Sequence, residues 1–598
     1  MARRKNRLQA GRLSSRPSPD QKVEDVPLDT NAHSGDSATS RISFVTLLAG
    51  ICGLATFLRL LNVLQTFEVP TLIELLGDAK GYFDWAVRIS DGNWYGTETF
   101  YQAPLYPYFL AVLITIAGPS ITLIRLVQMI LGVLGVALMG FAGRKLFNDR
   151  VGLVSAFMLA TYPPAIYYDG IIQKAAVATF LLCVVFASCV YLQREQRWWY
   201  AILTGSSLGL FVLARENALL WTPLIPVWMF FGLSGTRWKR LTLVGCYVAG
   251  LVLILLPIAA RNASLGGEWS PTTFQAGPNF YIGNNLESNG IYIPLIPGHG
   301  TPMYERADAE RLAEQAVGRE LSSREVSKFW MSRAWEEIRQ DPSRWIQLMI
   351  AKTFMVFNRY EVPDVESMYI FREYSAVLRL SHLWHFGILC PLGLWGVIAT
   401  RKDWRELWLY YLLLLTMIVA VVFFFLLGRY RNPIAILLIP FAAAGVVNIL
   451  IRFKEQRWRS VSLAAVLLIS GIFCNIRVHE EDSLQASCYM NMGISACRAG
   501  NLPEGIELLQ KSIKAFPEMA EGYVNLGRAF MLSRRPDRAA QCFEVALTLD
   551  PRLVDVHVML GEAYEFTGRG PEAIEQYRRA LEVDPADEQA AEGLGRVQ

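Results

Sequence analysis

One carboxylate, Asp78, lies in the loop that follows the first apolar run of the chain, residues 43–64. The loop, residues 65–103, is acidic and aromatic and ends at the corner Pro104-Leu105-Tyr106-Pro107. A carboxylate beside a membrane surface can accept the proton of an attacking hydroxyl group, which is general-base chemistry. Asp78 also follows a glycine and precedes a predicted helix at 79–90, so a helix-capping role is the alternative.

Two further side chains of this loop are candidates for substrate binding. Tyr82 follows Asp78 by four residues, so both lie on one face of the predicted helix. Asp84 belongs to the same helix, although the acidic residues of this loop could simply be solvated at a surface.

Charged residues at the ends of later apolar runs could hold a phosphate or a sugar. Asp169 and Lys174 lie at the start of one run, Arg215 lies between two runs, and Arg429 and Arg431 flank a tyrosine at another end. Arginine presents a planar fork of donors that fits phosphate, and charged residues beside membrane spans are functional candidates. The alternatives are that Lys174 extends toward the lipid surface and that the arginines anchor span ends to headgroups.

The long loop at 261–344 holds two asparagines, Asn279 and Asn284, that could bind sugar hydroxyls, although a turn-rich connector explains them nearly as well. His382 and His385 are three residues apart, but no further residues complete a metal site. A cofactor is therefore not established from the sequence, and a divalent cation is possible. No phosphate-cradling glycine motif, serine triad or nucleic-acid patch occurs, so no nucleic-acid partner is expected.

The composition places these residues in a membrane protein. Of 598 residues, 53% are hydrophobic and 18% are charged, whereas a soluble domain carries about 25% charged residues. Two short apolar runs, 105–117 and 345–357, are expected not to cross the membrane, since a crossing helix needs about 20 residues. The eleven predicted crossings are 43–64, 121–142, 151–167, 171–192, 198–214, 218–233, 241–260, 383–399, 407–427, 433–450 and 461–475.

Lysine and arginine in short loops predict the orientation, because such clusters stay on the cytoplasmic side. With eleven crossings and a cytoplasmic N-terminus, five basic clusters fall on that side and the candidate site residues fall on the opposite, outer face. The chain is then a multi-pass protein of the cell (inner) membrane with a periplasmic or extracytoplasmic C-terminal part. The five clusters lie at 144–150, 194–197, 237–240, 401–405 and 452–459.

A 34-residue period runs through residues 486–598. Glycine recurs at Gly493, Gly527 and Gly561, and proline follows each of these glycines by 24 residues. This pattern predicts three tetratricopeptide repeats and a capping helix at 587–597, with a protein partner for the repeats. Such repeats bury their helices against each other, so we expect them to fold without the membrane part and to be separable from its chemistry.

The acidic loop with Asp78, the Pro-Leu-Tyr-Pro corner and the string Arg429-Tyr430-Arg431-Asn432-Pro433 together resemble the bacterial, family 39-like branch of the GT-C glycosyltransferases, a branch similar to the protein mannosyltransferases. The resemblance implies transfer of a sugar from a polyprenyl-phosphate donor to a glycan, lipid or protein acceptor in the cell envelope, with Asp78 as base. Some members of that superfamily use a divalent ion and others do not.

The predicted fold class is all-α, a polytopic helical domain followed by a tetratricopeptide solenoid. The predicted domains are a disordered, basic cytoplasmic tail at 1–42, a membrane glycosyltransferase domain at 43–480 with outer loops 65–103 and 261–344, and the repeats at 486–598. Two other functions stay open. One is an O-antigen ligase or polymerase, which would carry its arginines in a late outer loop, and the other is a non-enzymatic membrane scaffold that recruits partners through its repeats.

Overall fold

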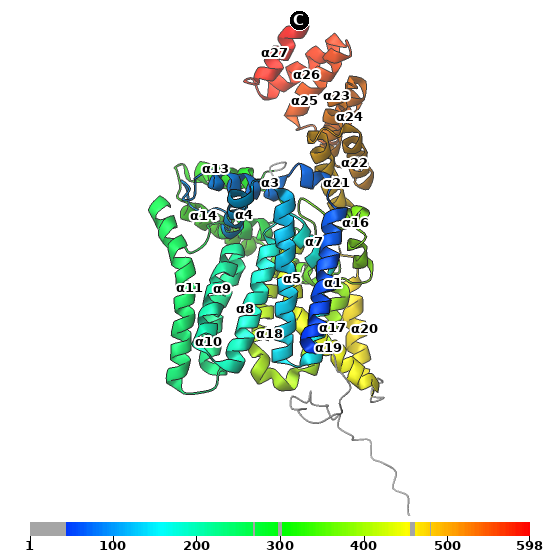
Figure 1. Cartoon of the computed structure of the whole chain (residues 1–598). Helices are drawn as coiled ribbons and strands as arrows, with labels where there is room; N and C mark the ends of the chain where they lie inside the picture. Colours follow the sequence, from blue (N-terminus) through cyan, green and yellow to red (C-terminus); the bar gives the residue numbers. More distant parts are fainter. Residues whose placement is uncertain (1–42, 267–268, 297–301, 455–460, 479) are drawn as a thin grey trace, which may run out of the picture. The chain divides into compact units, whose positions relative to one another are not determined.

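The computed structural model of the chain describes residues 43–266, 269–296, 302–454, 461–478 and 480–598. The predicted tail at 1–42 lies outside the described residues, as do parts of the loop 261–344 and of the last basic cluster. Over the described ranges the chain is helical, and its sole β-type pairing is an isolated bridge between Ile291 and Leu426. The all-α prediction is confirmed (Figure 1).

Within the described ranges, six helices are long and apolar enough to cross a membrane, and a seventh crossing would come from a pair of helices bent by 53°. The bent pair is α6 (Asp149–Thr161) and α7 (Pro163–Gly170), which meet at a proline that cannot continue the helix of α6. Other apolar runs form shorter helices, so the eleven predicted crossings remain a prediction. The six long helices are α1 (Phe44–Gln65), α5 (Ile121–Leu146), α8 (Ala175–Glu195), α11 (Arg237–Gly266), α18 (Trp404–Phe423) and α19 (Gly428–Lys454).

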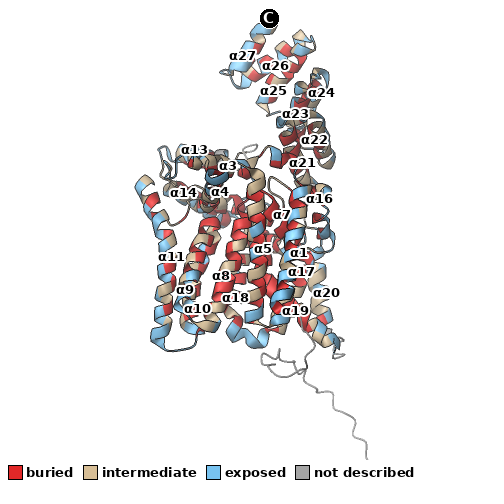
Figure 2. Cartoon of the chain, in the orientation of Figure 1, coloured by how far each residue is buried: buried red, intermediate tan, exposed pale blue. Residues whose placement is uncertain are grey.

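Burial separates central from peripheral helices in this bundle. The apolar stretches of α8 and α19 are 83% and 78% buried, whereas those of α1 and α11 are 22% buried. Figure 2 shows the difference as mostly red central helices and largely pale blue outer ones. Apolar side chains that stay exposed on an outer helix are those that lipid would cover.

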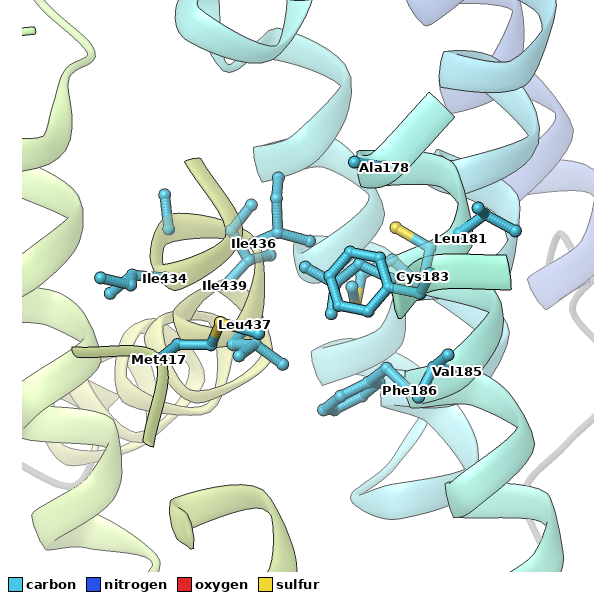
Figure 3. Close-up of a cluster of buried hydrophobic side chains, with 14 of the residues drawn as sticks. Ala178, Leu181, Cys183, Val185, Phe186, Met417, Ile434, Ile436, Leu437 and Ile439 are labelled. Atoms are coloured by element: carbon cyan, nitrogen blue, oxygen red, sulfur yellow. The ribbon is translucent and has the colours of Figure 1, made fainter. Parts of the chain in front are cut away.

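The centre of the bundle is a close-packed apolar core (Figure 3). Side chains of α8, among them Cys183 and Phe186, face α19 residues such as Ile436 and Ile439, with Met417 of α18 beside them. Dispersion contacts and interdigitated side chains hold such a core together when lipid replaces water as the surrounding medium. This core holds α8 and α19 in register, and each of these two helices begins beside a candidate site residue.

Three of the basic clusters meet at one end of the bundle. Lys145 pairs with Glu195 at 3.2 Å, and Arg194 pairs with Glu406 at 2.9 Å. Lys174 lies at the other end of α8, since it directly precedes that helix. The clusters at 144–150, 194–197 and 401–405 are therefore separated from the candidate site by the length of α8.

A group of shorter helices covers the end of the bundle where Lys174 lies, and we call this end the loop side. Helix α14 begins with a complete capping box in which Ser322 and Glu325 satisfy each other's backbone N–H groups.

The short helices of the membrane part are α2 (Pro70–Ile73), α3 (Gly77–Ser90), α4 (Leu105–Ala117), α9 (Trp198–Ala214), η1 (Glu216–Leu220), α10 (Trp221–Gly232), α12 (Ala276–Asn284), α13 (Pro302–Val317), α14 (Ser323–Gln340), α15 (Pro342–Phe357), α16 (Met368–Tyr374), η2 (Leu378–His382), α17 (Phe386–Ala399), η3 (Arg401–Asp403) and α20 (Val461–Asn475).

Three helical pairs and a last helix form the C-terminal repeats. In each repeat the recurring glycine faces a bulky side chain of the second helix, so that a Cβ on Gly527 would lie 2.5 Å from the Phe543 ring and one on Gly561 2.7 Å from the Tyr577 ring. The 34-residue period of glycines therefore reflects the positions at which the two helices of each repeat approach closely. The helices are α21 (Glu481–Arg498), α22 (Leu502–Ala515), α23 (Ala520–Leu532), α24 (Pro536–Leu549), α25 (Val554–Phe566), α26 (Gly570–Val583) and α27 (Glu588–Val597).

The first repeat helix, α21, packs on the membrane part as well as on its own repeat. Its residues Cys488 and Met492 share a buried core with Leu72 of α2 and with Tyr167 of α7. The hydroxyl of Ser495 donates to the carbonyl of Pro70 at 2.7 Å. These contacts place α21 against the membrane part, and whether the repeats can be separated from it stays a prediction.

Candidate functional site

The centre of the candidate site is one guanidinium group held by two carboxylates. Nη1 of Arg429, in the first turn of α19, contacts Oδ2 of Asp78 and lies 2.9 Å from Oδ2 of Asp364. The amide of Gln102 donates to the other oxygen of Asp78 at 3.4 Å. Asp78 lies within the first turn of α3, whose N-cap is Leu76, so its carboxylate binds Arg429 instead of capping the helix.

Asp364 is a site residue that sequence reasoning missed. It belongs to the segment Glu361-Val362-Pro363-Asp364-Val365-Glu366, which connects α15 to α16. Three carboxylates around one proline, directly after an apolar run, are an unusual grouping in a chain with 18% charged residues. That grouping is the signal that could have identified the segment.

A glycine brings the Asp78 helix against the Asp364 segment. Gly77 has a φ of +53°, and a Cβ at this position would lie 2.4 Å from a methyl group of Val365. Both the left-handed backbone and the close approach require glycine. Glycine at position 77 therefore allows the start of α3, which carries Asp78, to lie close to the segment that carries Asp364.

The two carboxyl groups respond differently to the same guanidinium. Burial opposes ionisation of Asp78, but Arg429, with help from Lys174 and Gln102, more than offsets it, so the pKa of Asp78 is lowered. Burial dominates at Asp364, where the neighbouring Asp78 charge adds to it, so the pKa of Asp364 is raised. Of the two carboxyl groups, Asp78 is thus the one whose ionised form the surroundings favour.

Two glutamates near this pair have pKa values close to neutrality. Burial, together with the charge of Asp364, raises the pKa of Glu366 to about 7. Glu305, in the first turn of α13, is half-buried, and its pKa is also raised to about 7 by burial and then by Asp78. Neither residue was predicted from the sequence, and both place titratable groups beside the ionised Asp78.

Two further cations face the same region. Lys174 is buried and has no salt-bridge partner among the described residues. The guanidinium of Arg215 donates to the carbonyl of Arg429 and lies over the Tyr430 ring at 5.0 Å, while its Nε has no hydrogen-bond partner. Lys174 and Arg215 therefore add two cations near the pair of Asp78 and Arg429, and the Glu216 carboxylate acts on both of them.

A narrow cavity opens beside the carboxylate pair. Its walls come from α3, from α7 with Tyr167 and Tyr168, from the segment 361–366 and from Arg429. The cavity volume is about 30 Å³, which is room for one or two water molecules. A sugar would fit only after the contacts of Arg429 had opened.

The structure brings five of the predicted residues together: Asp78, Lys174, Arg215 and Arg429, with Tyr82 behind them. Tyr82 is buried on the Asp78 face of α3, as the spacing predicted, and packs edge-on against Tyr106 with ring centres 5.4 Å apart. It supports the helix that carries Asp78.

Two predicted charges are occupied in buried ion pairs of their own. Arg431 pairs with Glu361 and lies over the Phe386 ring at 4.6 Å, and the two charged side chains are only 1% and 8% exposed. Asp169 pairs with Arg59 at 2.8 Å, again deep in the protein. Neither Arg431 nor Asp169 lines the cavity beside Asp78.

Three other predicted residues are also not brought to Asp78. Asp84 forms a half-exposed ion pair with Lys80 at 3.3 Å. Asn284 donates to the carbonyl of Phe423 at 2.8 Å and accepts from the Trp345 indole at 3.0 Å, so it joins helices. Asn279 is half-buried on α12 and does not line the cavity.

The carboxylates do not suit a metal ion in this arrangement. Within the ranges that the structure describes, no group of three His, Cys, Asp or Glu side chains converges on one point. Arg429 also occupies the position between Asp78 and Asp364 that a bridging cation would need.

Comparison with known families gives the class of this helical membrane domain and supports a GT-C-type membrane glycosyltransferase family. Residues 101–261 match the family of dolichyl-phosphate-mannose-protein mannosyltransferases. Residues 490–553 and 530–597 match tetratricopeptide-repeat models. The chain therefore carries a mannosyltransferase-family domain followed by tetratricopeptide repeats.

Solved structures resemble both parts. The oligosaccharyltransferase of Archaeoglobus fulgidus in its apo form is 15% identical, with a TM-score of 0.44, over 81% of this chain and 61% of that chain. The TPR domain of Arabidopsis OM64 is 22% identical, with a TM-score of 0.19, over 20% of this chain and 97% of that chain. The search of curated proteins finds no match.

Proposed function

We propose that this protein moves a sugar from a polyprenyl-phosphate carrier to an acceptor hydroxyl at the outer face of the cell membrane, with Asp78 as base. The observation that carries the proposal is the ionised Asp78 carboxylate beside Arg429, Lys174 and Arg215. A base next to several cations suits a reaction in which a hydroxyl loses a proton while a phosphate leaves with added negative charge.

The proposed step balances as a substitution at the anomeric carbon of the sugar. The acceptor oxygen forms a bond to that carbon, and the bond from the carbon to the carrier phosphate oxygen breaks. The acceptor proton goes to Asp78, and the bond electrons leave with the phosphate. The cations Lys174 and Arg215 lie where they could stabilise that charge, since neither has a carboxylate within salt-bridge distance among the described residues.

Binding of the donor would also activate the base. Arg429 is engaged by Asp78 and Asp364 before a donor binds. A phosphate would compete for this guanidinium, because charge-assisted contacts from arginine to phosphate are strong. Asp78 would then lose part of the interaction that lowers its pKa and become a stronger base when the acceptor is present.

The orientation of the site is part of the proposal. The clusters around Lys145 and Arg194 lie at the end of the bundle away from Lys174. Basic residues in short loops favour the cytoplasmic side, which leaves Asp78 and the repeats on the periplasmic or extracytoplasmic side. There the repeats would bind a protein partner or a protein acceptor, since helical repeats present extended binding surfaces.

Transfer of radiolabelled sugar from a panel of polyprenyl-phosphate sugars, measured with the purified full chain in lipid, tests the proposal. Asp78→Asn keeps the size of the side chain but removes the proton acceptor, so transfer should fall by about 10²- to 10⁴-fold. Asp84→Asn is the matched control, because Asp84 belongs to the same helix and forms only a surface pair. No transfer from any donor, or wild-type transfer by Asp78→Asn, would refute the assignment.

A further inference from the structure

A second polar groove lies next to the candidate site but is separate from it. Two adjoining cavities of about 250 and 340 Å³ run between the segment 359–361, α16, η2 and the start of α21. We call them together the α16–α21 groove. Both are larger than the 30 Å³ cavity beside Asp78. Glu361 and Met368 line both the groove and that smaller cavity.

Three arginines give the groove a positive charge. Arg359, Arg372 and Arg379 line it, and none of them has a carboxylate within salt-bridge distance in the part of the chain that the structure describes. Arg372 lies over the Tyr369 ring at 4.8 Å, and Arg379 donates to the carbonyl of Arg372 at 3.2 Å. The guanidinium groups of Arg372 and Arg379 are therefore held by neutral partners and keep their charge for a ligand.

The acidic residues along the groove are mostly engaged elsewhere. Glu361 pairs with Arg431, and Glu373 accepts from Tyr489 and pairs with Lys511 at 3.4 Å. Glu481 is the one other carboxylate among the described lining residues. Three arginines against one unengaged glutamate leave a cationic groove.

Neutral donors complete the lining. Ser381 is 7% exposed and borders the groove, and its hydroxyl has no hydrogen-bond partner among the described residues. Burial and the charges of Arg359 and Arg431 lower the pKa of His385 to about 4, so its ring is neutral at physiological pH. Because Nδ1 of His385 accepts from the N–H of Gly387 at 3.1 Å, the ring proton lies on Nε2 and can be donated.

Exposed apolar side chains flank the groove where the apolar helices end. Leu383, directly after η2, is 76% exposed, and Ile476, directly after α20, is 49% exposed. Asn358 donates to the carbonyl of Ile476 at 2.6 Å, which ties the end of α20 to the segment that carries Arg359. A ligand that extends out of the groove could therefore contact cations inside it and exposed apolar side chains beside it.

We propose that the α16–α21 groove binds the phosphate of an anionic membrane lipid. The arginines and the neutral donors contact the phosphate oxygens, while the acyl chains lie along Leu383 and Ile476. Guanidinium groups fit phosphate well, and an orphaned buried hydroxyl gains the partner that it lacks. The proposal concerns a site outside the Asp78 cavity and does not depend on the sugar-transfer reaction.

Binding is measured with the full chain in detergent micelles by titration with short-chain phosphatidylglycerol, short-chain phosphatidylcholine and inorganic phosphate. Phosphatidylglycerol should bind at least about tenfold more tightly than phosphatidylcholine, since its net negative charge strengthens the hydrogen bonds from the arginines. Inorganic phosphate should compete with it, but weakly, because it lacks the apolar chains. If inorganic phosphate binds as tightly as phosphatidylglycerol, the groove is a site for free phosphate, and the proposal that it binds a lipid is refuted.

A double variant tests the residues. Arg359→Gln with Arg372→Gln should weaken phosphatidylglycerol binding about tenfold or more. The control Arg324→Gln with Arg339→Gln removes the same charge from exposed positions of α14 and should leave binding unchanged. Equal weakening in both double variants would show non-specific attraction of charge, and unchanged binding in the groove variant would refute the site.

Discussion

The two arginines of the string Arg429-Tyr430-Arg431 are two residues apart in the first turn of one helix, but they lie in opposite surroundings. Arg431 pairs with one carboxylate, Glu361, and this balanced pair is almost fully buried. Arg429 is shared by two carboxylates, borders a cavity and lies beside two more cations. A buried one-to-one ion pair such as that of Arg431 and Glu361 stabilises this fold, whereas a shared cation beside a cavity, such as Arg429, can take part in chemistry.

The largest expected effect would come from breaking the balanced pair. Glu361→Gln leaves Arg431 buried without its counter-charge, which should lower the free energy of unfolding by about 3–5 kcal/mol. Thermal unfolding of the purified protein measures the change. The double variant Arg431→Met with Glu361→Leu should recover much of the loss, because an apolar pair carries no unpaired charge. Equal destabilisation by the single and double variants would contradict this role.

Replacing Arg429 should change activity and its pH dependence. In Arg429→Gln, Asp78 loses the cation that lowers its pKa, so the pKa of Asp78 rises. In the wild type, any stability from ionised Asp78 is present above the unfolded-state pKa and lost as the pH falls through the lower folded-state value.

The acidic limb of the transfer rate should therefore move to higher pH in Arg429→Gln. At neutral pH transfer should fall by about 10²-fold, as expected for loss of an electrostatic contact in the site. A rate profile from pH 4 to pH 9 measures both effects. If the acidic limb does not move, Arg429 does not control the ionisation of Asp78, and this prediction is wrong.

A smaller effect is expected within the repeats, where α21 contacts the segment that carries Asp364 and the later repeat helices do not. Asn491 of α21 donates to the carbonyl of Val365 at 3.0 Å, next to Asp364. A chain that ends at residue 480 should lose about tenfold or more of its transfer to a small acceptor, because positioning errors near a reacting group are costly. A chain that ends at residue 519 keeps α21 and α22 and should retain that transfer. Equal activity of the two truncated chains would contradict a positioning role for α21.

The smallest effect is expected at the surface pair. Asp84→Asn removes a half-exposed contact with Lys80, so stability should change by less than about 0.5 kcal/mol. Transfer should stay at the wild-type rate. A large loss of transfer would show that Asp84 does bind substrate. It would also contradict the distinction between the buried pair of Arg431, the cavity contact of Arg429 and the surface pair of Asp84.

Much of the fold could be predicted from the sequence because it depends on local or periodic signals. Apolar runs indicated the long helices, and the 34-residue period indicated the repeats with their glycine contacts. The placement of Asp78, Lys174, Arg215 and Arg429 at corresponding helix ends also followed from counting apolar runs. The crossings over the shorter apolar runs stay a prediction, since a run such as 218–233 forms a twelve-residue helix, α10, with a proline inside.

The sequence by itself determined which helices form, where they end and which charges lie at those ends, because spacing, proline and glycine act over a few residues. Only the tertiary structure decided which charge meets which. Asp78 and Arg429 are 351 residues apart in the chain, and nothing near Arg431 indicates that Glu361 neutralises it. Ion pairs form between side chains that packing brings within a few ångströms, and in this protein that packing depends on the core between α8 and α19 and on the contact of α21 with the Asp364 segment.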